Sequence, residues 1–345
     1  MNKKIINLAK SDNNNNWQTA ISFYEEWQHN ITQFELTTSG STGKPKPISI
    51  TRAQMEASAL QTIAFLKLLP SYHLLICINT NYIGGKMMLV RGLLNNMSIY
   101  VTEPSSNPLK NIHLPIDFMA IVPMQLQTML QEREHEKLNK IKAIIVGGAV
   151  INPFLEKQIE QLQVPIYATY GMTETVSHIA LKPMNGKEKS NYFTTLGDVK
   201  IALDDRNCLT ITGSVTNHTT IVTNDIVKLI SDNQFEWLGR FDNIINSGGI
   251  KINPEQIENR IAQLFLEHQI HQRFFMYGID DELLGQKAVL MIEGVKLETI
   301  DLLQLLTRHL DKYQCPKSIL YVDRFAETET GKIKRKETIS NFAQN

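Results

Sequence analysis

A short stretch near the amino terminus, TTSGSTGKPKPISI at residues 37–50, gathers hydroxyl side chains, glycines and lysines. These residue types suggest a loop that closes on phosphate, because glycine lets the backbone bend while hydroxyl, amide and ammonium groups donate hydrogen bonds to phosphate oxygens. The stretch is not a P-loop, since that pattern requires a hydroxyl residue where Pro45 follows Lys44. Gly40 and Gly43 are also too close together for a P-loop.

Two further stretches combine residues that suit ligand binding. VGGAV at residues 146–150 follows a predicted strand and opens a predicted helix, where backbone can approach a ligand, although a plain tight turn explains it more simply. YGMTET at residues 170–175 places one carboxylate beside two threonines. Such a carboxylate suits Mg²⁺ shared with phosphate oxygens, and a surface turn without a ligand is an equal alternative.

The elements that would position these residues alternate between strand and helix. Short apolar runs at residues 73–79, 97–102, 118–122 and 142–148 predict buried strands, and apolar spacing predicts helices over residues 52–69, 84–94 and 123–138. This alternation predicts an α/β fold with a layered, mostly parallel sheet. Beyond residue 190, the short segments VKIAL, CLTIT, TTIVTNDIVKLI and QFEWLG predict antiparallel hairpins.

A different pattern begins at Gly239. We expect a loop rich in glycine and asparagine, a helix from near Pro254, two strands around a polar turn at residues 280–285, and a final amphipathic helix over residues 299–313. About a hundred residues suffice for a small α+β domain. We therefore predict a large domain over residues 1–240 and a small carboxy-terminal domain over residues 241–345.

Composition limits the class of protein. With 35 basic and 35 acidic residues the net charge is zero, which gives no general attraction to nucleic acid or anionic membrane. The cysteines Cys77, Cys208 and Cys315 lack metal-ligand spacing. The sequence shows no signal-peptide pattern and no apolar run of the roughly 18 residues that a membrane span requires. We expect a soluble cytoplasmic protein with no membrane insertion.

The order of the motifs carries more information than any one of them. TSGSTGKPK, GGA, YGMTET, TND, GRFDNIINSGG and TGKIKR follow one another between residues 36 and 336. In this order they resemble the motifs of the adenylate-forming acyl-CoA synthetase superfamily, which includes luciferases and the adenylation domains of peptide synthetases. The resemblance implies an enzyme that uses ATP, Mg²⁺, a small carboxylic acid and CoA.

The resemblance also implies roles for residues of the large domain. The first loop would grip the β- and γ-phosphates of ATP through Thr38, Ser39, Gly40, Ser41, Thr42, Gly43 and Lys46. The adenine would lie against Gly147, Gly148, Ala149, Tyr170 and Gly171. Thr173 would bond the α-phosphate and Glu174 would hold Mg²⁺. Asp225 would receive the ribose hydroxyls, and Arg240 would bond the ribose or pair only locally.

For the small domain, the resemblance implies a catalytic lysine and a rotation between two half-reactions. Lys332 would reach the attacking carboxylate and the α-phosphate, where its charge offsets the negative charge that develops. The domain would then rotate about a hinge at Asp242 and bring a loop to the active site for the pantetheine arm of CoA. That loop is Ser247, Gly248 and Gly249.

The sequence departs from the superfamily pattern in three places. It reads TND where relatives read TGD, and PKP where they read PKG, and both changes keep the functional side chains. About 36 residues precede the phosphate loop, where most relatives carry a sizeable subdomain. We expect an acyl site that is more open or is completed by a partner chain, so a homodimer is one expected assembly.

The acyl substrate depends on the segment NYIGGKMMLVRGLL, in which Tyr82 occupies the aromatic position that gates the acyl site in relatives. Arg91 lies within an apolar helix, where an arginine is costly without an anion. The second carboxylate of a dicarboxylic acid would supply that anion, and the alternatives are that Arg91 reaches the surface or pairs with a protein acid. With Ser177 and His178 beyond Glu174, the pattern looks most like the o-succinylbenzoate–CoA ligases of menaquinone synthesis. His178 would touch the substrate carboxylate or only cap local polar groups.

Several other functions remain as alternatives. The acid could be a different aryl or fatty acid, and the protein could load a carrier protein. A non-catalytic nucleotide-binding relative would have no chemical need for both Glu174 and Lys332. The spacing of His268 and His271 suggests zinc, but without a third ligand nearby we interpret both as solvated residues on a helix surface.

Overall fold

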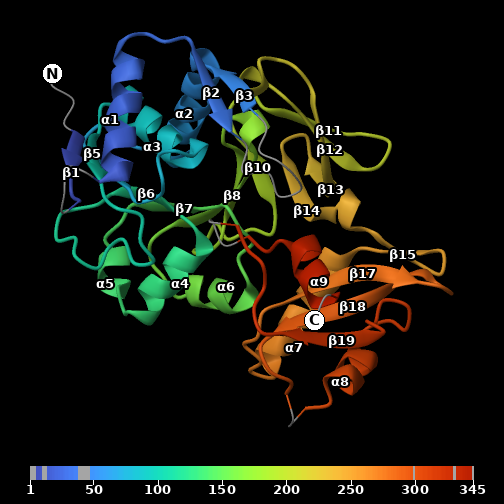
Figure 1. Ribbon diagram of the computed structural model, residues 1–345. Helices are drawn as coiled ribbons and strands as arrows, with labels where there is room; N and C mark the ends of the chain where they lie inside the picture. The colour runs from blue at the N-terminus through green and yellow to red at the C-terminus, as the bar shows by residue number, and fades with distance from the viewer. Residues whose placement is uncertain (1–4, 10–13, 38–46, 298–299, 329–331, 344–345) are drawn as a thin grey trace.

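The structure is a computed structural model that describes residues 5–9, 14–37, 47–297, 300–328 and 332–343. Among these residues, a mixed sheet of twelve strands runs through the larger part of the molecule (Figure 1). One half of this sheet is parallel, with the strand order β1, β5, β4, β6, β7, β8. The bounds of these strands are Ile5–Asn7, Ser98–Val101, His73–Ile76, Phe118–Ile121, Ala143–Val146 and Ile166–Gly171. The predicted α/β class is confirmed, and the strands predicted to be parallel are parallel, but the sheet as a whole is mixed because the predicted hairpins continue it.

Helices cover both faces of the parallel half (Figure 1). Strand β4 shows how the faces divide, because Leu74 and Ile76 enter one apolar core while Leu75 and Cys77 enter the other. The first core also contains residues of α1 (Asn15–Gln28), α2 (Arg52–Leu66) and α3 (Ile83–Leu94). The second contains residues of α4 (Pro123–Gln131), α5 (His135–Leu138) and α6 (Pro153–Ile159). A strand covered on both faces reads as a continuous apolar run, which is why these strands were predictable.

The helix predicted over residues 123–138 is two helices. Arg133 adopts φ 64° and ends α4, with the amide of Glu134 donating to the Met129 carbonyl and the amide of Arg133 donating to the Leu130 carbonyl. This is the Schellman pattern of helix termination, in which glycine is the usual residue at the left-handed position. Arginine at this position gave no signal in the sequence, so the prediction was wrong.

The other half of the large sheet is antiparallel, as predicted. Its strands follow β8 in the order β9, β10, β14, β13, β12, β11. Their bounds are His178–Pro183, Phe193–Thr195, Gln234–Arg240, Ile221–Ser231, Cys208–Thr212 and Lys200–Leu203. Short 3₁₀ helices lie at η1 (Thr173–Thr175), η2 (Ser214–Thr216) and η3 (Phe241–Asn243). Strands β2 (Gln33–Thr37) and β3 (Pro47–Thr51) form a separate antiparallel pair.

A second sheet begins after Arg240. Its strands are β15 (Ile245–Ser247), β16 (Ile250–Ile252), β17 (Phe274–Asp281), β18 (Gly285–Glu293) and β19 (Ser318–Val322). One apolar core joins this sheet to α7 (Pro254–Glu267) and α8 (Leu302–His309), and another cluster joins it to α9 (Arg335–Ala343). Each sheet thus has its own core. We propose that the chain divides into domains 1–240 and 241–345 at this change of sheet.

The segment that the sequence predicted as a loop before Pro254 contains a hairpin. Strands β15 and β16 pair antiparallel, with Ser247 opposite Ile250. The turn between them is Gly248 at φ 58° and Gly249 at φ 83°. Two successive positive φ values match the twist of a two-residue hairpin, and glycine adopts them without strain. The pair of glycines was the missed signal.

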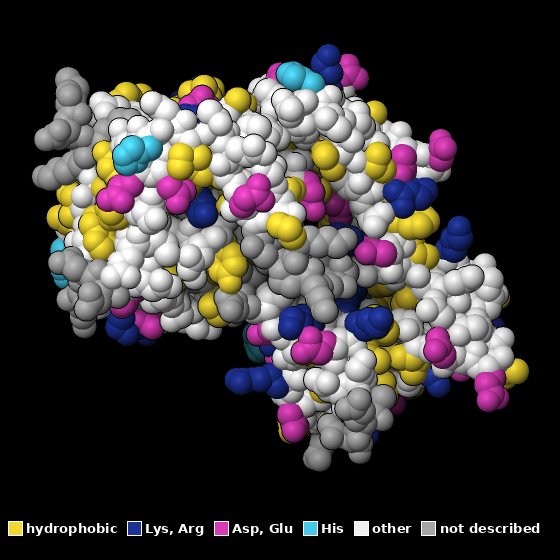
Figure 2. All heavy atoms as spheres, turned by 45° about the horizontal axis from the view of Figure 1, so that its top comes forward, with side chains coloured by type: hydrophobic (Ala, Val, Ile, Leu, Met, Phe, Trp, Pro, Cys, Tyr) yellow, Lys and Arg dark blue, Asp and Glu magenta, His cyan; other side chains and the backbone are white. Residues whose placement is uncertain are grey.

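The surface fits the neutral composition. Figure 2 shows basic and acidic side chains interspersed over the face that it presents. Within the part of the chain that the structure describes, we find no helix long and apolar enough to cross a membrane.

Candidate active site

The predicted nucleotide residues meet at the carboxyl ends of β7 and β8, the edge where parallel α/β sheets bind ligands. Gly147, Gly148 and Ala149 directly follow β7, while Tyr170 and Gly171 end β8. A Cβ atom at Gly171 would lie 2.3 Å from the carbonyl oxygen of Ser177 and 2.4 Å from the Cα of His178. Glycine is therefore required here so that β9 can pass close to the end of β8.

The predicted phosphate-loop residues lie outside the described residues. These are Thr38, Ser39, Gly40, Ser41, Thr42, Gly43 and Lys46. The strands on either side, β2 and β3, pair along their length, with Thr37 opposite Pro47. This pairing places residues 37 and 47 side by side. The binding of phosphate by the residues between them stays a prediction.

Glu174 lies in η1, next to Thr173. Its side chain is exposed, and no hydrogen bond or ion pair among the described residues engages its carboxylate. The described residues also contain no group of three or more His, Cys, Asp or Glu side chains that could hold a metal ion. A single free carboxylate beside a threonine hydroxyl fits Mg²⁺ that takes its other ligands from phosphate and water.

Asp225 is the centre of a buried polar cluster. The hydroxyl of Tyr170 donates to Asp225 Oδ2 over 2.7 Å, and the indole Nε1–H of Trp237 donates to Asp225 Oδ1 over 3.2 Å. Burial and the neighbouring Asp225 carboxylate raise the pKa of Tyr170, so its hydroxyl keeps its proton. Phe193 and Phe235 pack against the Tyr170 ring. The carboxylate that the sequence assigned to ribose binding is thus fixed by side chains from β8 and β14.

Arg240 joins this cluster to the segment between the two sheets. Its Nη1 lies 3.9 Å from Asp225 Oδ1, while its Nε and Nη2 donate to the two carboxylate oxygens of Asp242 over 2.8 and 3.0 Å. This paired geometry raises the pKa of Arg240 and lowers that of Asp242. Arg240 therefore pairs with Asp242 at the predicted hinge, next to the predicted ribose carboxylate, and its bonding to the ribose stays a prediction.

Lys332 approaches the same cluster from the second sheet. The turn that carries Lys332 is closed by backbone bonding between Thr328 and Lys332, and in Figure 1 the segment leading to α9 reaches toward the large sheet. The pKa of the Lys332 ammonium is lowered, because partial desolvation and the positive charge of Arg240 outweigh the opposite effect of Asp225 and Asp242. The predicted catalytic lysine and the predicted ribose site are therefore within electrostatic reach of each other.

The predicted CoA loop lies elsewhere in this arrangement. Ser247, Gly248 and Gly249 form the tip of the β15–β16 hairpin, which Figure 1 places at the outer side of the second sheet, away from the end of β8. A Cβ atom at Gly249 would meet nothing within 4 Å. The structure thus brings Lys332, and not these glycines, to the nucleotide residues.

Arg91, Ser177 and His178 form a second buried cluster, beside α3. Arg91 is 1% exposed, although it belongs to a helix that is apolar on most faces. Its Nη2 donates to Ser177 Oγ over 3.1 Å, and its buried Nε has no hydrogen-bond partner among the described residues. No described acid forms an ion pair with it. Both alternatives from the sequence, a surface position and a protein acid, are therefore absent from the described structure. Tyr82 lies at the amino terminus of the same helix.

A strained turn leads into this cluster. Val176 has φ 68° and ψ −54°, and the amide of Ser177 donates to the carbonyl of Thr175 over 2.7 Å. This is a γ-turn with positive φ, which is rare and strained, and such a conformation costs about 1–3 kcal/mol in a side chain of this kind. The turn carries the chain from Glu174, in the predicted Mg²⁺ site, to Ser177 and His178, in the predicted acyl site. The strained residue therefore lies between these two predicted sites.

The sequence missed two residues that the structure adds to these clusters. Trp237 bonds Asp225 from β14, and Thr62 lies 2.9 Å from His178 Nε2 through its hydroxyl oxygen. Thr62 and His178 are 116 residues apart in the sequence. Asp225 and Trp237 lie on the paired strands β13 and β14. Neither position had a distinctive spacing that could have revealed it.

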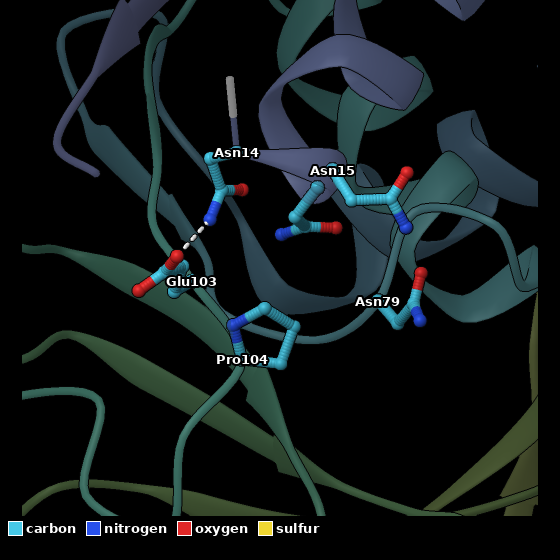
Figure 3. Close-up of a pocket in the computed structure, with 6 residues that line it drawn as sticks. Asn14, Asn15, Asn79, Glu103 and Pro104 are labelled. Carbon is cyan, nitrogen blue, oxygen red and sulfur yellow. Dashed lines mark hydrogen bonds between the residues drawn. The ribbon is translucent and has the colours of Figure 1, made fainter. Parts of the chain in front are cut away.

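Two other sequence features have structural roles. The asparagines at residues 14–16 line a small polar pocket with Asn79, Glu103 and Pro104 (Figure 3). Asn14 caps α1 and donates to Glu103, and Asn16 bonds the carbonyl of Thr102 and the amide of Thr80. These amides join α1 to the strand ends. His268 lies just past the end of α7 and His271 packs on Phe154. Both side chains are exposed, as predicted, but they lie beyond the helix and not on its surface.

Comparisons with known proteins agree with this geometry. The AMP-binding enzyme family matches residues 10–208. The 2-succinylbenzoate–CoA ligase of Lactococcus lactis is 27% identical over 351 residues, covering 92% of this chain and 76% of the relative. The corresponding ligase of Listeria monocytogenes serovar 1/2a is 26% identical, covering 90% and 70%.

Solved structures extend the comparison. An acyl-CoA synthetase (AMP-forming)/AMP-acid ligase II-like protein from Dyadobacter fermentans is 44% identical, with a TM-score of 0.65 and 96% of each chain covered. The o-succinylbenzoate coenzyme A synthetase of Bacillus subtilis, solved with ATP and a magnesium ion, has a TM-score of 0.72 at 21% identity, covering 88% of this chain and 69% of that one. This chain therefore belongs to the AMP-binding enzyme family, as an enzyme of the AMP-forming acyl-CoA ligase kind.

Proposed function

We propose that this enzyme converts o-succinylbenzoate, ATP and CoA into o-succinylbenzoyl-CoA, AMP and pyrophosphate. The observation that supports this substrate is Arg91, a buried cation with one oxygen partner, Ser177, among the described residues. An arginine has five N–H donors, and leaving a buried charge uncompensated is costly. A dicarboxylic acid supplies the missing anion, because one carboxylate reacts while the other binds Arg91.

Burial lowers the pKa of the Arg91 guanidinium to about 9, so it remains charged at neutral pH. The two carboxylate oxygens of a ligand can accept from a guanidinium in a bidentate pair, which favours arginine over lysine for this role. Ser177 accepts from the Arg91 Nη2–H over 3.1 Å, which leaves the other N–H groups of the guanidinium for the ligand carboxylate. The curated relatives named for 2-succinylbenzoate are consistent with the proposal.

In the first half-reaction, an oxygen of the reacting carboxylate attacks the α-phosphorus of ATP. The bond from that phosphorus to the β-phosphate oxygen breaks, giving acyl-AMP and pyrophosphate. Asp225 would accept from the ribose hydroxyls, and Lys332 would place its positive charge beside the attacking oxygen and the α-phosphate. Glu174 would hold Mg²⁺, which when bound neutralises phosphate charge, and Thr173 would bond the α-phosphate.

In the second half-reaction, the thiolate of CoA attacks the acyl carbonyl and AMP leaves with the bonding electron pair. The turn of Gly248 and Gly249 would lie along the pantetheine arm, since neither residue has a side chain to obstruct it. That turn is far from β8 in the present arrangement (Figure 1). The small domain must therefore rotate about Asp242 between the two half-reactions, withdrawing Lys332.

Acid-dependent pyrophosphate release tests the proposal, with o-succinylbenzoate, benzoate, 4-hydroxybenzoate and octanoate as substrates. We expect release with o-succinylbenzoate and a thioester on addition of CoA. Arg91→Gln should raise the KM for this acid about tenfold to a hundredfold, the worth of hydrogen bonds to a charged group, and leave the KM for ATP unchanged. Release with a monocarboxylate alone would contradict the proposed substrate and retain the reaction class.

Lys86→Ala is the matched control. Lys86 is a second cation on α3, but its ammonium lies over the ring of Phe23 at 5.5 Å and is near Glu26, two residues of α1. We expect its KM for o-succinylbenzoate to equal that of the unmodified enzyme. An equal rise in both variants would mean that loss of positive charge, and not the position of Arg91, weakens binding.

A further inference from the structure

A continuous chain of hydrogen bonds begins at Arg91 and ends at the backbone of α2. Arg91 Nη2 lies 3.1 Å from Ser177 Oγ, Ser177 Oγ lies 3.5 Å from His178 Nδ1, and His178 Nε2 lies 2.9 Å from Thr62 Oγ1. The Thr62 hydroxyl in turn lies 3.0 Å from the carbonyl oxygen of Ser58. The chain links α3, the start of β9 and α2, and each of Arg91, His178 and Thr62 is buried.

The partners at the two ends fix the direction of every bond. A carbonyl oxygen only accepts, so the Thr62 hydroxyl donates to Ser58 and its oxygen must accept from His178 Nε2–H. A neutral imidazole that carries its proton on Nε2 has a lone pair on Nδ1, which can accept from the Ser177 hydroxyl. A guanidinium only donates, so Ser177 Oγ accepts from Arg91. No step of the chain places two donors or two acceptors against each other.

The charge next to His178 also favours the neutral imidazole. Arg91 is the charged group that acts on it, and burial together with this positive charge lowers the pKa of His178 well below its usual value. A second proton on the imidazole would turn Nδ1 into a donor and reverse the Ser177 hydroxyl. The neutral ring is therefore the form that matches both its neighbours and its burial.

We propose that Thr62 and His178 are positioning residues for the acyl substrate: Thr62 fixes the Nε2–H tautomer of His178, whose Nδ1 holds the Ser177 hydroxyl and, through it, the Arg91 guanidinium. The inference rests on the proposed function, in which Arg91 binds the second carboxylate. Thr62 touches no part of the substrate in this scheme. Its effect passes through His178 and Ser177, and it should act on substrate binding and not on nucleotide binding.

The first test needs no substrate. Nitrogen-15 NMR of the histidine-labelled full-length protein reports which ring nitrogen carries the proton, and His178→Asn identifies the signal. We expect His178 to be neutral with its proton on Nε2 at neutral pH, and Thr62→Val to abolish that single tautomer. A proton on Nδ1, or a signal that Thr62→Val leaves unchanged, would overturn the proposal whatever acid the enzyme uses.

The second test uses kinetics. Thr62→Val removes the acceptor for Nε2–H at nearly constant volume, and we expect the KM for o-succinylbenzoate to rise about tenfold, the effect of one lost hydrogen bond. The KM for ATP should stay constant. Thr62→Ser keeps the hydroxyl and should restore the original KM. Equal KM values for the valine and serine variants would overturn the proposed role.

Thr128→Val is the matched control, because the Thr128 hydroxyl makes the same kind of bond, to the Met124 carbonyl one turn earlier in α4, with no histidine beside it. We expect no change in KM. If Thr62→Val does not fold, His178→Asn serves instead, since its amide oxygen can replace Nδ1 but cannot reach Thr62. If the unmodified enzyme does not use the dicarboxylic acid at all, the proposed function fails, while the NMR result still decides the tautomer.

Discussion

The two clusters on either side of the β8–β9 junction are each centred on one buried charge, Asp225 in the first and Arg91 in the second. The protein surrounds these two charges differently. The Asp225 carboxylate receives hydrogen bonds from Tyr170 and Trp237, with Arg240 at 3.9 Å. The Arg91 guanidinium has Ser177 as its oxygen partner among the described residues, and its Nε has none. The nucleotide cluster is thus compensated by the protein, and the acyl cluster is not.

This difference suggests how each cluster is maintained without ligand. Tyr170 and Trp237 keep the Asp225 carboxylate in a fixed position, and each oxygen retains a second lone pair for a ligand. The acyl cluster carries a buried charge that destabilises the empty enzyme, and the substrate anion would relieve that cost. The first cluster therefore adds to stability and the second subtracts from it.

The largest effect should come from the residue that completes the nucleotide cluster from the second domain. Lys332→Ala should lower the rate of acyl-adenylate formation about a hundredfold to a thousandfold, the usual loss for one electrostatic contact to a transition state. Thioester formation from supplied acyl-adenylate should remain near its original rate, because Lys332 is withdrawn in that step. Pyrophosphate release and thioester formation, measured separately, test this prediction.

Lys334→Ala is the control for that experiment. Lys334 is two residues away and pairs with Glu337 at 3.1 Å on the surface. Both half-reactions should keep their rates in this variant. Equal losses in the two half-reactions of Lys332→Ala would contradict the role of Lys332 in adenylation.

The second prediction tests the comparison of the clusters through stability. Arg91→Met replaces a buried, poorly compensated cation with an apolar side chain of similar length, so the free energy of unfolding should rise by about 1–3 kcal/mol. Asp225→Leu leaves the Tyr170 hydroxyl and the Trp237 indole N–H without their acceptor, so the free energy of unfolding should fall by about 2–4 kcal/mol. Denaturant unfolding of the ligand-free variants measures both changes.

The comparison of the clusters requires that the free energy of unfolding change in opposite directions in the two variants. A loss of stability in Arg91→Met would mean that the protein already compensates the guanidinium, and the argument for a substrate anion would fail. Saturating o-succinylbenzoate should raise the Tm of the unmodified enzyme and leave that of Arg91→Met unchanged, because binding stabilises the folded state only where affinity remains.

Much of the fold was predictable because its signals are local. Strands buried on both faces produce continuous apolar runs, and the helices between them show apolar spacing. The site motifs were predictable for a related reason, since each is a short contiguous stretch of the sequence. The sequence contained no indication of a turn where a residue other than glycine adopts a positive φ. Arg133 ends α4 at a position where glycine is common, and Val176 adopts a turn that valine rarely forms.

The sequence could not resolve how Arg91 is compensated. An arginine in an apolar helix is compatible with a surface position, a protein acid or a ligand, and the choice depends on which elements cover α3. The structure places α1 and α2 next to α3 and brings Ser177 against the guanidinium. The partners Thr62 and Trp237 were missed for the same reason, since their contacts arise from packing between elements and not from spacing along the chain.

The smallest predicted effect is a pH dependence that comes from the acyl cluster. His178 is neutral in the folded protein, because burial and Arg91 lower its pKa well below the ordinary value of 6.5. In the unfolded chain the same residue takes up a proton as the pH falls below about 6.5. The unfolded state then binds more protons than the folded state, so stability must decrease as the pH falls.

The slope of this decrease approaches about 1.4 kcal/mol per pH unit for one histidine. His178→Asn removes the titrating group, so the difference in unfolding free energy between the unmodified protein and the variant should shrink by that amount per unit between about pH 6 and pH 5. Taking the difference cancels the other histidines, which titrate alike in both proteins. A constant difference across this range would mean that His178 is protonated in the folded state, and the chain from Thr62 to Arg91 could not have the direction inferred for it.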